Sequence, residues 1–299
     1  MGHPANEIFG PTNDSGTGMC DTQSGRKTEL RNKIFLSAIV LISIINTFTL
    51  IAVAANRHLR KRTMLLVINL TAADLLVAVV SGPLLTFEPD YKVLHSIIIS
   101  VVGNFFFSAS LVSLSLISLD RLHATLHPFR HCLIEKYVYF KVIACSWVIA
   151  LLMASLTGVI GRIYLNGTSV KCVTFSFTFI TLIIITVSYI SIRVNVKKTS
   201  HSHSGAISSE KKLSMTLFIM IAAYMLTILP LSTWWILECS KCCLNQLSKR
   251  LNIEDAMVFV YFTNAIVNPI IYALRMREFR KGIKIVFCKV VRSMLCASS

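Results

Sequence analysis

Asp74 is the one acidic residue that lies deep inside a long apolar stretch of this sequence, because no other charged residue occurs from Thr63 to Phe87. A carboxylate in hydrocarbon either takes up a proton or recruits a cation. Polar side chains in other apolar stretches are candidates to surround it: Asn46, Ser110, Asn264 and Asn268. Several oxygens of this kind suit a small hard cation such as Na⁺. The residue types therefore predict an intramembrane sodium site.

The spacing of Asn264 and Asn268 supports this grouping, because residues four apart share one face of a helix. A second explanation uses the same residues without an ion. Buried amides and hydroxyls also hold membrane helices together by hydrogen bonds between helices. The spacing alone favours neither explanation over the other.

Catalytic groups and metal ligands do not gather anywhere else in the sequence. His95 and Cys145 are isolated, and His201 and His203 lie in a serine-rich segment. The group Cys239, Cys242 and Cys243 is not followed by the second ligand pair that a zinc site of this kind needs. We therefore predict no catalytic residue and no enzyme activity, and no cofactor apart from the possible allosteric Na⁺.

The elements that position Asp74 are membrane-spanning helices. Hydrophobic residues make up 54% of the 299 positions and charged residues only 15%, whereas soluble domains carry about 25% charged residues. About 20 apolar helical residues span a bilayer, and the alternating segments of about 10 residues that mark barrel strands do not occur. Seven stretches of 19 to 27 residues contain no charged residue apart from Asp74. They predict an all-α bundle of seven transmembrane helices: 34–56, 63–87, 93–119, 142–161, 172–192, 213–237 and 256–274.

Lysine and arginine predict the orientation of these helices. With the N-terminus outside, the inner segments hold 20 of the 30 basic residues; these segments are 57–62, 121–141, 193–212 and 275–299. We expect an extracellular tail over 1–33, the helical domain over 34–274 and a cytoplasmic amphipathic helix and tail over 275–299 of a plasma-membrane protein. Basic patches between spans favour lipid headgroups or a cytoplasmic protein partner over nucleic acid.

Residues on the two faces fit this topology. The sequons at Asn13 and Asn166 fall outside the membrane on the extracellular side, where N-glycosylation occurs. Cysteines that face the oxidising side are candidates for disulfides, and their odd number leaves at least one without an intramolecular partner: Cys20, Cys172, Cys239, Cys242 and Cys243. Cys288 and Cys296 lie near the inner surface and are candidates for palmitoylation.

A set of motifs, each in the appropriate span, resembles the rhodopsin-like (class A) G-protein-coupled receptors. Span two reads Leu70-Thr71-Ala72-Ala73-Asp74-Leu75, and span three ends in Asp120-Arg121-Leu122. Trp147 lies in span four, and span seven contains Asn264-x-x-x-Asn268-Pro269-x-x-Tyr272 followed by Phe279. The resemblance covers residues 34–287. It implies a receptor that binds an extracellular ligand and activates a heterotrimeric G protein.

The resemblance also implies roles for particular residues. Arg121 would pair with Asp120 and with Glu210 at the foot of span six, which would hold spans three and six together in the resting state. Tyr189 and Tyr272 would fill the gap when span six swings outward. Asn46 and Trp147 would pack the helices, and Pro230 and Pro269 would kink theirs. There are two alternatives. Arg121 would be only one of the positive charges on the cytoplasmic side, and Pro230 would kink its helix for packing without acting as a pivot.

Other positions depart from the family pattern. Ser96 stands where most relatives carry a cysteine, Thr181 where they carry a proline, and Ile228 where they carry an aromatic residue. Gly103 occupies the position of the aspartate of amine receptors, and span seven has no lysine for retinal. The pattern is most similar to the melanocortin, lysophospholipid, cannabinoid and adenosine branch.

The ligand-binding residues are expected between the outer halves of spans three, five, six and seven. The polar and aromatic candidates there are Ser100, Asn104, Thr174, Thr178, Trp234, Trp235 and Glu238. Part of this set can equally face lipid as interfacial anchors. Alternative functions are a diverged seven-helix receptor that does not signal, given Leu122 and Ile228, and a small transporter. A transporter would show internal repeats or several charges near the midplane, and the sequence has neither.

Overall fold

The computed structural model describes residues 17–55, 62, 64–86, 92–164, 167–199, 219, 222–230, 233, 253–275, 279–284 and 288, and within these ranges it is helical without any strand. The main helices are α1 (Thr17–Ala55), α2 (Met64–Leu76), α3 (Gly82–Thr86), α4 (Lys92–Leu126), α5 (Pro128–Leu133), α6 (Lys136–Tyr164), α7 (Gly167–Thr199) and α10 (Ile253–Arg275). One π-helical turn, Val77–Ser81, joins α2 to α3. The predicted all-α class is confirmed.

Five helical segments in the described ranges are long and apolar enough to cross a membrane: Glu29–Ala55, Met64–Thr86, Ile97–Leu126, Lys136–Ile163 and Ser169–Val196. They correspond to the first five predicted spans. The apolar helix Phe262–Leu274 lies within the predicted seventh span. Within the predicted sixth span, residues 222–230 are helical.

Helix α1 starts earlier than its apolar composition indicates. The first uncharged stretch begins at Ile34, but the helix begins at Thr17. The segment from Thr17 to Lys33 is therefore helical where we expected an extracellular tail. Charged side chains such as Glu29 and Lys33 do not stop a helix, and these two form an i,i+4 ion pair of 2.7 Å.

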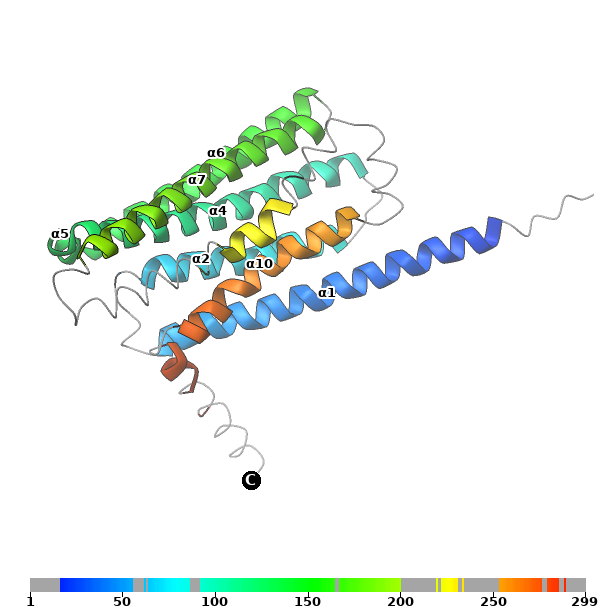
Figure 1. The fold of residues 1–299 in the computed structure, drawn as a ribbon. Coiled ribbons are helices and arrows are strands. Elements are labelled where there is room, and N and C mark those ends of the chain that lie inside the picture. The colour runs from blue at the N-terminus through cyan, green and yellow to red at the C-terminus, as the bar shows by residue number, and fades with distance from the viewer. Residues whose placement is uncertain are drawn as a thin grey trace, which may run out of the picture.

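Helix α4 holds the bundle together. It packs against α2, α6 and α7, while α1 packs against α2 and α10 (Figure 1). Buried serines line α4, among them Ser108, Ser110 and Ser113. Large apolar side chains such as Leu152 in α6 and Val187 in α7 are exposed on the outside of the bundle. Polar groups inside and apolar groups outside are the arrangement that a lipid solvent requires.

The close approach of α1 to the start of α3 depends on Gly82. A Cβ atom placed there would lie 2.6 Å from Cγ1 of Ile39. A side chain at this position would force the Ile39 side chain or α1 itself to shift, and α1 supplies Asn46 to the interior.

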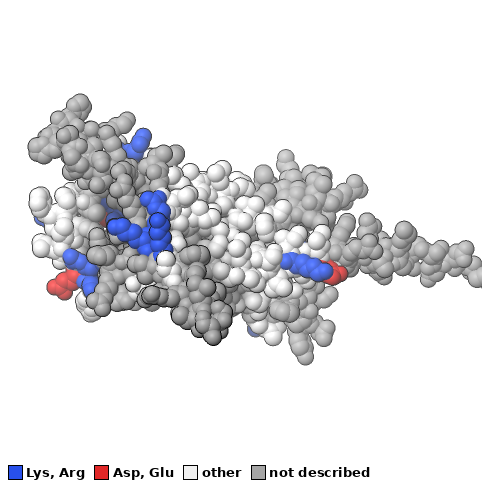
Figure 2. Space-filling model, turned by 90° about the horizontal axis from the view of Figure 1, so that it is seen from below, with Lys and Arg blue, Asp and Glu red and all other residues white. Residues whose placement is uncertain are grey.

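Charged side chains mark the two ends of the bundle differently. We call the end at which α1, α4, α7 and α10 finish and α2 and α6 begin the α5 end. Figure 2 shows Lys and Arg gathered near this end and a largely uncharged surface in the middle of the molecule. Arg130 in α5 and Lys136 at the start of α6 are exposed there.

Candidate functional site

Asp74 lies in the centre of the bundle, where three helices meet. Its side chain is buried, at 2% exposure. The hydroxyl of Ser110 in α4 donates a hydrogen bond of 2.7 Å to Oδ1, and Nδ2 of Asn268 in α10 donates one of 2.9 Å to Oδ2. Both carboxylate oxygens therefore accept a bond from another helix. The structure brings these predicted sodium-site residues together.

Asn46 and Asn264 have other partners. Asn46 donates to the carbonyl oxygens of Ile42, at 3.0 Å, and of Ala265, at 3.1 Å, which joins α1 to α10. Asn264 accepts a bond of 3.2 Å from the hydroxyl of Thr227. Neither amide hydrogen-bonds to Asp74 in the described part of the chain. Each serves as a contact between helices, and the acceptor Oδ1 of Asn46 is buried with no donor among the described residues.

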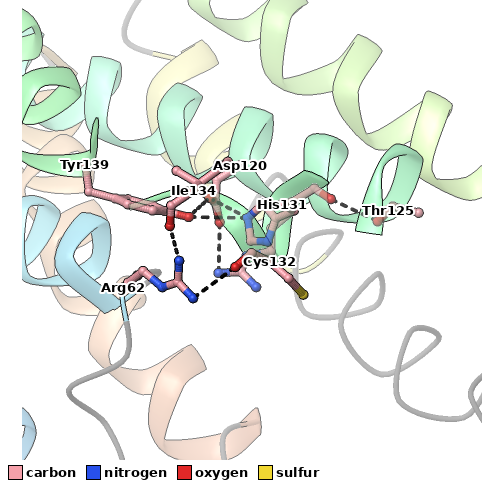
Figure 3. Close-up of polar contacts among 8 residues, drawn as sticks. Arg62, Asp120, Thr125, His131, Cys132, Ile134 and Tyr139 are labelled. Carbon is pink, nitrogen blue, oxygen red and sulfur yellow. Dashed lines mark hydrogen bonds and ion pairs between the residues drawn. The ribbon is translucent and has the colours of Figure 1, made fainter. Parts of the chain in front are cut away.

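At the α5 end, Asp120 is the centre of a second polar cluster (Figure 3). Oδ2 forms an ion pair of 3.0 Å with Nη2 of Arg121. Oδ1 accepts a bond of 2.7 Å from the hydroxyl of Tyr139 in α6, and lies 3.1 Å from Nε2 of His131 in α5. The Asp120 side chain is only 8% exposed and that of Arg121 20%. The predicted contact of Asp120 with Arg121 is present.

Arg62 fixes the chain around this cluster. Its guanidinium donates to the carbonyl oxygens of Ile134 and Cys132, the latter at 3.2 Å (Figure 3). This clamp holds the end of α5 and the residue that follows it, next to His131, which contacts Asp120. Sequence reasoning missed the local roles of Arg62, His131 and Tyr139. No periodic signal connects them to Asp120, because a turn of the chain brings them there.

The other predicted switch residues occupy different surroundings. Tyr272 is 2% exposed, its ring lies edge-on to Phe279, and its hydroxyl has no hydrogen-bond partner among the described residues. Tyr189 is half-buried, with the guanidinium of Arg193 5.9 Å from its ring centre. Glu210 lies outside the described residues. Its predicted contact with Arg121 therefore stays a prediction.

The two kink residues are both found in helices. Pro269 lies inside α10 next to Asn268. Pro230 is the last residue of the described helical run 222–230. Its carbonyl oxygen, like that of Leu229, accepts a bond from the hydroxyl of Thr233. A proline lacks the amide proton that its own helix would use, so both positions are suited to a bend.

Trp147 belongs to a buried network that joins three helices. Its indole Nε1 in α6 donates to Oδ1 of Asn69 in α2 at 2.9 Å. Nδ2 of Asn69 lies 2.7 Å from the hydroxyl of Ser113 in α4 and 3.4 Å from that of Ser146. The predicted packing role of Trp147 thus has a specific partner. Asn69 falls inside the second predicted span, but no sequence pattern pairs it with Trp147.

Candidate ligand residues meet between α4 and α7. The hydroxyl of Thr174 donates to Oδ1 of Asn104 at 2.9 Å, and Nδ2 of Asn104 donates to the Ser100 carbonyl at 2.7 Å. Thr178 donates to the Thr174 carbonyl one turn away. A Cβ atom added to Gly103, beside Asn104, would have nothing within 4 Å of it. Trp234, Trp235 and Glu238 lie outside the described residues.

The predicted modification sites fall mostly outside the described part of the chain. This is the case for Asn13, Asn166, Cys239, Cys242, Cys243 and Cys296. Cys20 lies in α1, but its side chain is not described. Cys172 in α7 and Cys288 are exposed. The expected glycosylation, disulfides and palmitoylation therefore remain predictions.

Comparison with known proteins identifies the class of protein. The sequence model of the family described as 7 transmembrane receptor (rhodopsin family) matches residues 45–272, most of the chain. The chain belongs to this family. It is a seven-helix membrane receptor that binds a ligand and signals through G proteins, and it is not an enzyme.

Individual relatives are receptors as well. The chain is 26% identical to the histamine H2 receptor of Rattus norvegicus over 286 residues, which cover 86% of this chain and 79% of the relative. Over 130 residues it is 32% identical to the neuropeptide FF receptor 1 of Rattus norvegicus, covering 40% of this chain and 30% of the relative. It is 33% identical to the prokineticin receptor 2 of Mus musculus over 132 residues, covering 40% and 34%. The narrower resemblance to the melanocortin and related branch stays a prediction.

Proposed function

We propose that this receptor lies in the plasma membrane with its N-terminus outside, and that it activates its G protein through Arg121 at the α5 end. The observation that carries the proposal is the ion pair of Arg121 with Asp120 at the basic end of the bundle. Positive charge gathers on the cytoplasmic side of membrane proteins, so the α5 end faces the cytoplasm. Ligand then enters from the opposite end.

The surroundings of Arg121 are those of a resting state. Its guanidinium is mostly covered and paired, so a G protein cannot reach it without a rearrangement. Tyr272 supports this interpretation, because its buried hydroxyl lacks a partner among the described residues. A buried polar group without a partner is costly, and a second conformation that satisfies it gains that energy. The rearrangement would move Tyr272 and Tyr189 toward the space that opens beside Arg121.

Helix α5 supplies an apolar surface for the partner. Phe129 is 87% exposed and Leu133 is 79% exposed, and Arg130 between them is exposed as well. Large apolar side chains of this exposure, next to basic ones, are typical of a protein contact surface. We assign this surface to the G protein because it adjoins the cluster of Asp120 and Arg121.

The ligand would bind in the outer half of the bundle, against the Asn104 and Thr174 pair. Similarity to a histamine receptor does not carry histamine over to this chain, because Gly103 stands where amine receptors carry an aspartate. The open space at Gly103 leaves room for a ligand group, and the neighbouring amide and hydroxyl offer neutral hydrogen bonds. We infer a ligand that is held by neutral polar contacts at this position and not by a carboxylate.

Sodium would bind beside Asp74 and favour the resting state. The donor set fits the ion, because Asp74 and Ser110 offer hard oxygen ligands and Asn46 has a buried acceptor oxygen without a donor among the described residues. Asn268 would orient the carboxylate through its amide. In this role the ion shifts an equilibrium between two receptor forms, and takes no part in any reaction.

A ligand screen on membranes that report nucleotide exchange by added G proteins tests the proposal. Candidate ligands would be neutral polar compounds and peptides, and Asn104→Leu and Thr174→Val should lower potency at unchanged surface expression. A ligand that binds saturably without exchange on any G-protein class would point instead to a non-signalling receptor. Ile228, buried at 1% exposure where relatives carry an aromatic residue, favours that second candidate.

A further inference from the structure

His131 occupies a position in the Asp120 cluster that G-protein coupling does not by itself require. The side chain is 15% exposed, and its Nε2 points at two oxygens at once. It lies 3.1 Å from Oδ1 of Asp120 and 3.3 Å from the hydroxyl oxygen of Tyr139 (Figure 3). An imidazole is the side chain that exchanges its charge between about pH 5 and 8. The carboxylate that holds Arg121 is thus in direct contact with a titratable group.

The hydrogen bond of the Tyr139 hydroxyl indicates which ring nitrogen of His131 carries a proton. The Tyr139 hydroxyl has one proton, and it donates this proton to Asp120 at 2.7 Å. Its oxygen is left to accept from His131, as is the carboxylate oxygen. Nε2 therefore carries a proton in either charge state. In this tautomer the neutral ring has its lone pair on Nδ1, so the contact of Nε2 with Asp120 is the same whether the ring is neutral or charged.

A protonated His131 places a second cation on a carboxylate that already binds one. Arg121 occupies Oδ2 at 3.0 Å, while His131 occupies Oδ1 of the same group. Like charges at such short range repel, and the single negative charge is then shared. Since Arg121 is held chiefly by that charge, its departure becomes less costly.

The other charged and titratable groups around His131 do not cancel this effect. Arg62 is cationic and binds the carbonyls of Ile134 and Cys132. The His123 ring lies 5.6 Å from the rings of both His127 and His131, and each of these imidazoles adds positive charge when protonated. Tyr139 donates to Asp120 as a neutral phenol. Among the described groups that face His131, Asp120 is therefore the only anion.

We propose that His131 is a positioning residue that makes the hold of Asp120 on Arg121 depend on proton concentration, so that protonation of its imidazole favours the signalling form of the receptor. The proposal rests on the coupling role assigned to Arg121. It deepens that role by adding an input from the cytoplasmic side, independent of the ligand. A merely structural contact of His131 would not respond to pH in this range.

The test is basal nucleotide exchange by one purified G protein on receptor membranes at about pH 6 and about pH 7.5, which bracket the histidine range. Three receptors are compared at matched expression: the parent, His131→Gln and His127→Gln. Glutamine keeps a neutral donor but cannot titrate, and His127 is the matched histidine, which forms no bond with Asp120 in the described part of the chain. Dividing each response by that of Arg121→Ala at the same pH removes the pH dependence of the G protein itself.

We expect exchange by the parent and by His127→Gln to rise about threefold on acidification, the size of effect that a partly exposed charge pair produces. His131→Gln should show no rise. A second variant, His131→Tyr, whose phenol stays neutral in this pH range, should behave as His131→Gln does.

Equal pH responses in the parent and in both His131 variants would overturn the inference while leaving the coupling role intact. Exchange by the parent no greater than that of Arg121→Ala at either pH would overturn the coupling role, and with it this inference. If the rise in exchange on acidification is lost in His127→Gln and kept in His131→Gln, the effect belongs to His127. That result would also overturn the proposal.

Discussion

The hydroxyl of Ser110 lies 2.7 Å from Oδ1 of Asp74, and this hydrogen bond joins α4 to α2 in the middle of the bundle. On its other oxygen, Asp74 accepts a bond from Asn268 in α10. The carboxylate thus links α2 to both α4 and α10. The proposed sodium ion would therefore act on the contacts between these three helices.

Replacing Asp74 tests the sodium proposal. Na⁺ held at Asp74 would favour the resting state, so basal nucleotide exchange should fall several-fold when K⁺ is replaced by Na⁺ at constant ionic strength. Asp74→Asn removes the charge and should abolish this difference. The control is Ser176→Ala, at an exposed site in α7. A substitution of Asn69, another buried polar residue of α2, would not serve, because Asn69 accepts a bond from Trp147. Equal sodium sensitivity in Asp74→Asn would place the ion elsewhere.

Removal of the coupling arginine should abolish signalling. Arg121→Ala is expected to lower agonist-driven and basal exchange at least tenfold, because it removes the group proposed to contact the G protein. Lys141→Ala is the matched control, since it removes a positive charge near the same end from an exposed site over the Tyr137 ring. Surface expression should be similar in both. Parental exchange by Arg121→Ala would show that the motif does not couple here.

Loss of Glu210 should have the opposite effect. A restraint of Arg121 by Glu210 would be partly exposed and worth about 1 kcal/mol, which corresponds to a roughly fivefold change in the equilibrium between resting and active forms. Glu210→Ala should therefore raise ligand-independent exchange several-fold at near-normal expression. Glu210→Gln should produce a similar rise, because it keeps the size of the side chain and loses the charge. Unchanged basal exchange in both variants would remove Glu210 from the switch.

The contact of Asn69 with Trp147 should matter for stability more than for signalling. Asn69→Leu leaves the indole proton of Trp147 without its acceptor and removes the bond that the Ser113 hydroxyl accepts, at a cost of about 1–3 kcal/mol. The purified receptor in detergent should unfold several degrees lower, as followed by thiol-reactive dye or tryptophan fluorescence. Ser176→Ala should unfold within a degree of the parent, at roughly the small effect typical of exposed sites. A parental unfolding temperature for Asn69→Leu would mean that the network contributes little.

The orientation of the chain is open to a direct biochemical test. Treatment with a glycosidase should reduce the apparent mass of the expressed receptor, and Asn13→Gln combined with Asn166→Gln should abolish that shift. An epitope tag after Ser299 should be accessible only after the cells are permeabilised. Accessibility of the tag on intact cells would reverse the orientation, and would place most of the basic residues outside.

Much of the fold follows from composition, as the transmembrane helices show. Uncharged stretches near 20 residues long have only one stable form in lipid, because a helix satisfies every backbone hydrogen bond internally. The first and last residues of an uncharged stretch do not predict where the helix itself begins or ends. Helix α1 runs back to Thr17 through charged residues, since a helix outside hydrocarbon tolerates Glu29 and Lys33.

The interior site was predictable in part. Asp74 had to find polar partners because burial of a carboxylate without them is costly, and Ser110 and Asn268 are those partners. Asn46 and Asn264 carry the same chemistry but bond elsewhere. Which of four suitable side chains reaches Asp74 depends on the rotation of each helix about its axis, and residue type does not encode that rotation.

The sequence by itself determined that this chain is a helical membrane receptor with a carboxylate in its core and an arginine at the basic end of span three. Only the tertiary structure decided what surrounds that arginine. His131 and Tyr139 reach Asp120 because the chain turns after α4 and runs through α5. Arg62 holds this turn through its bonds to the carbonyl oxygens of Cys132 and Ile134, which lie 70 and 72 residues further along the chain. Contacts made by such a return of the chain have no periodicity, so they become visible only when the helices are packed together.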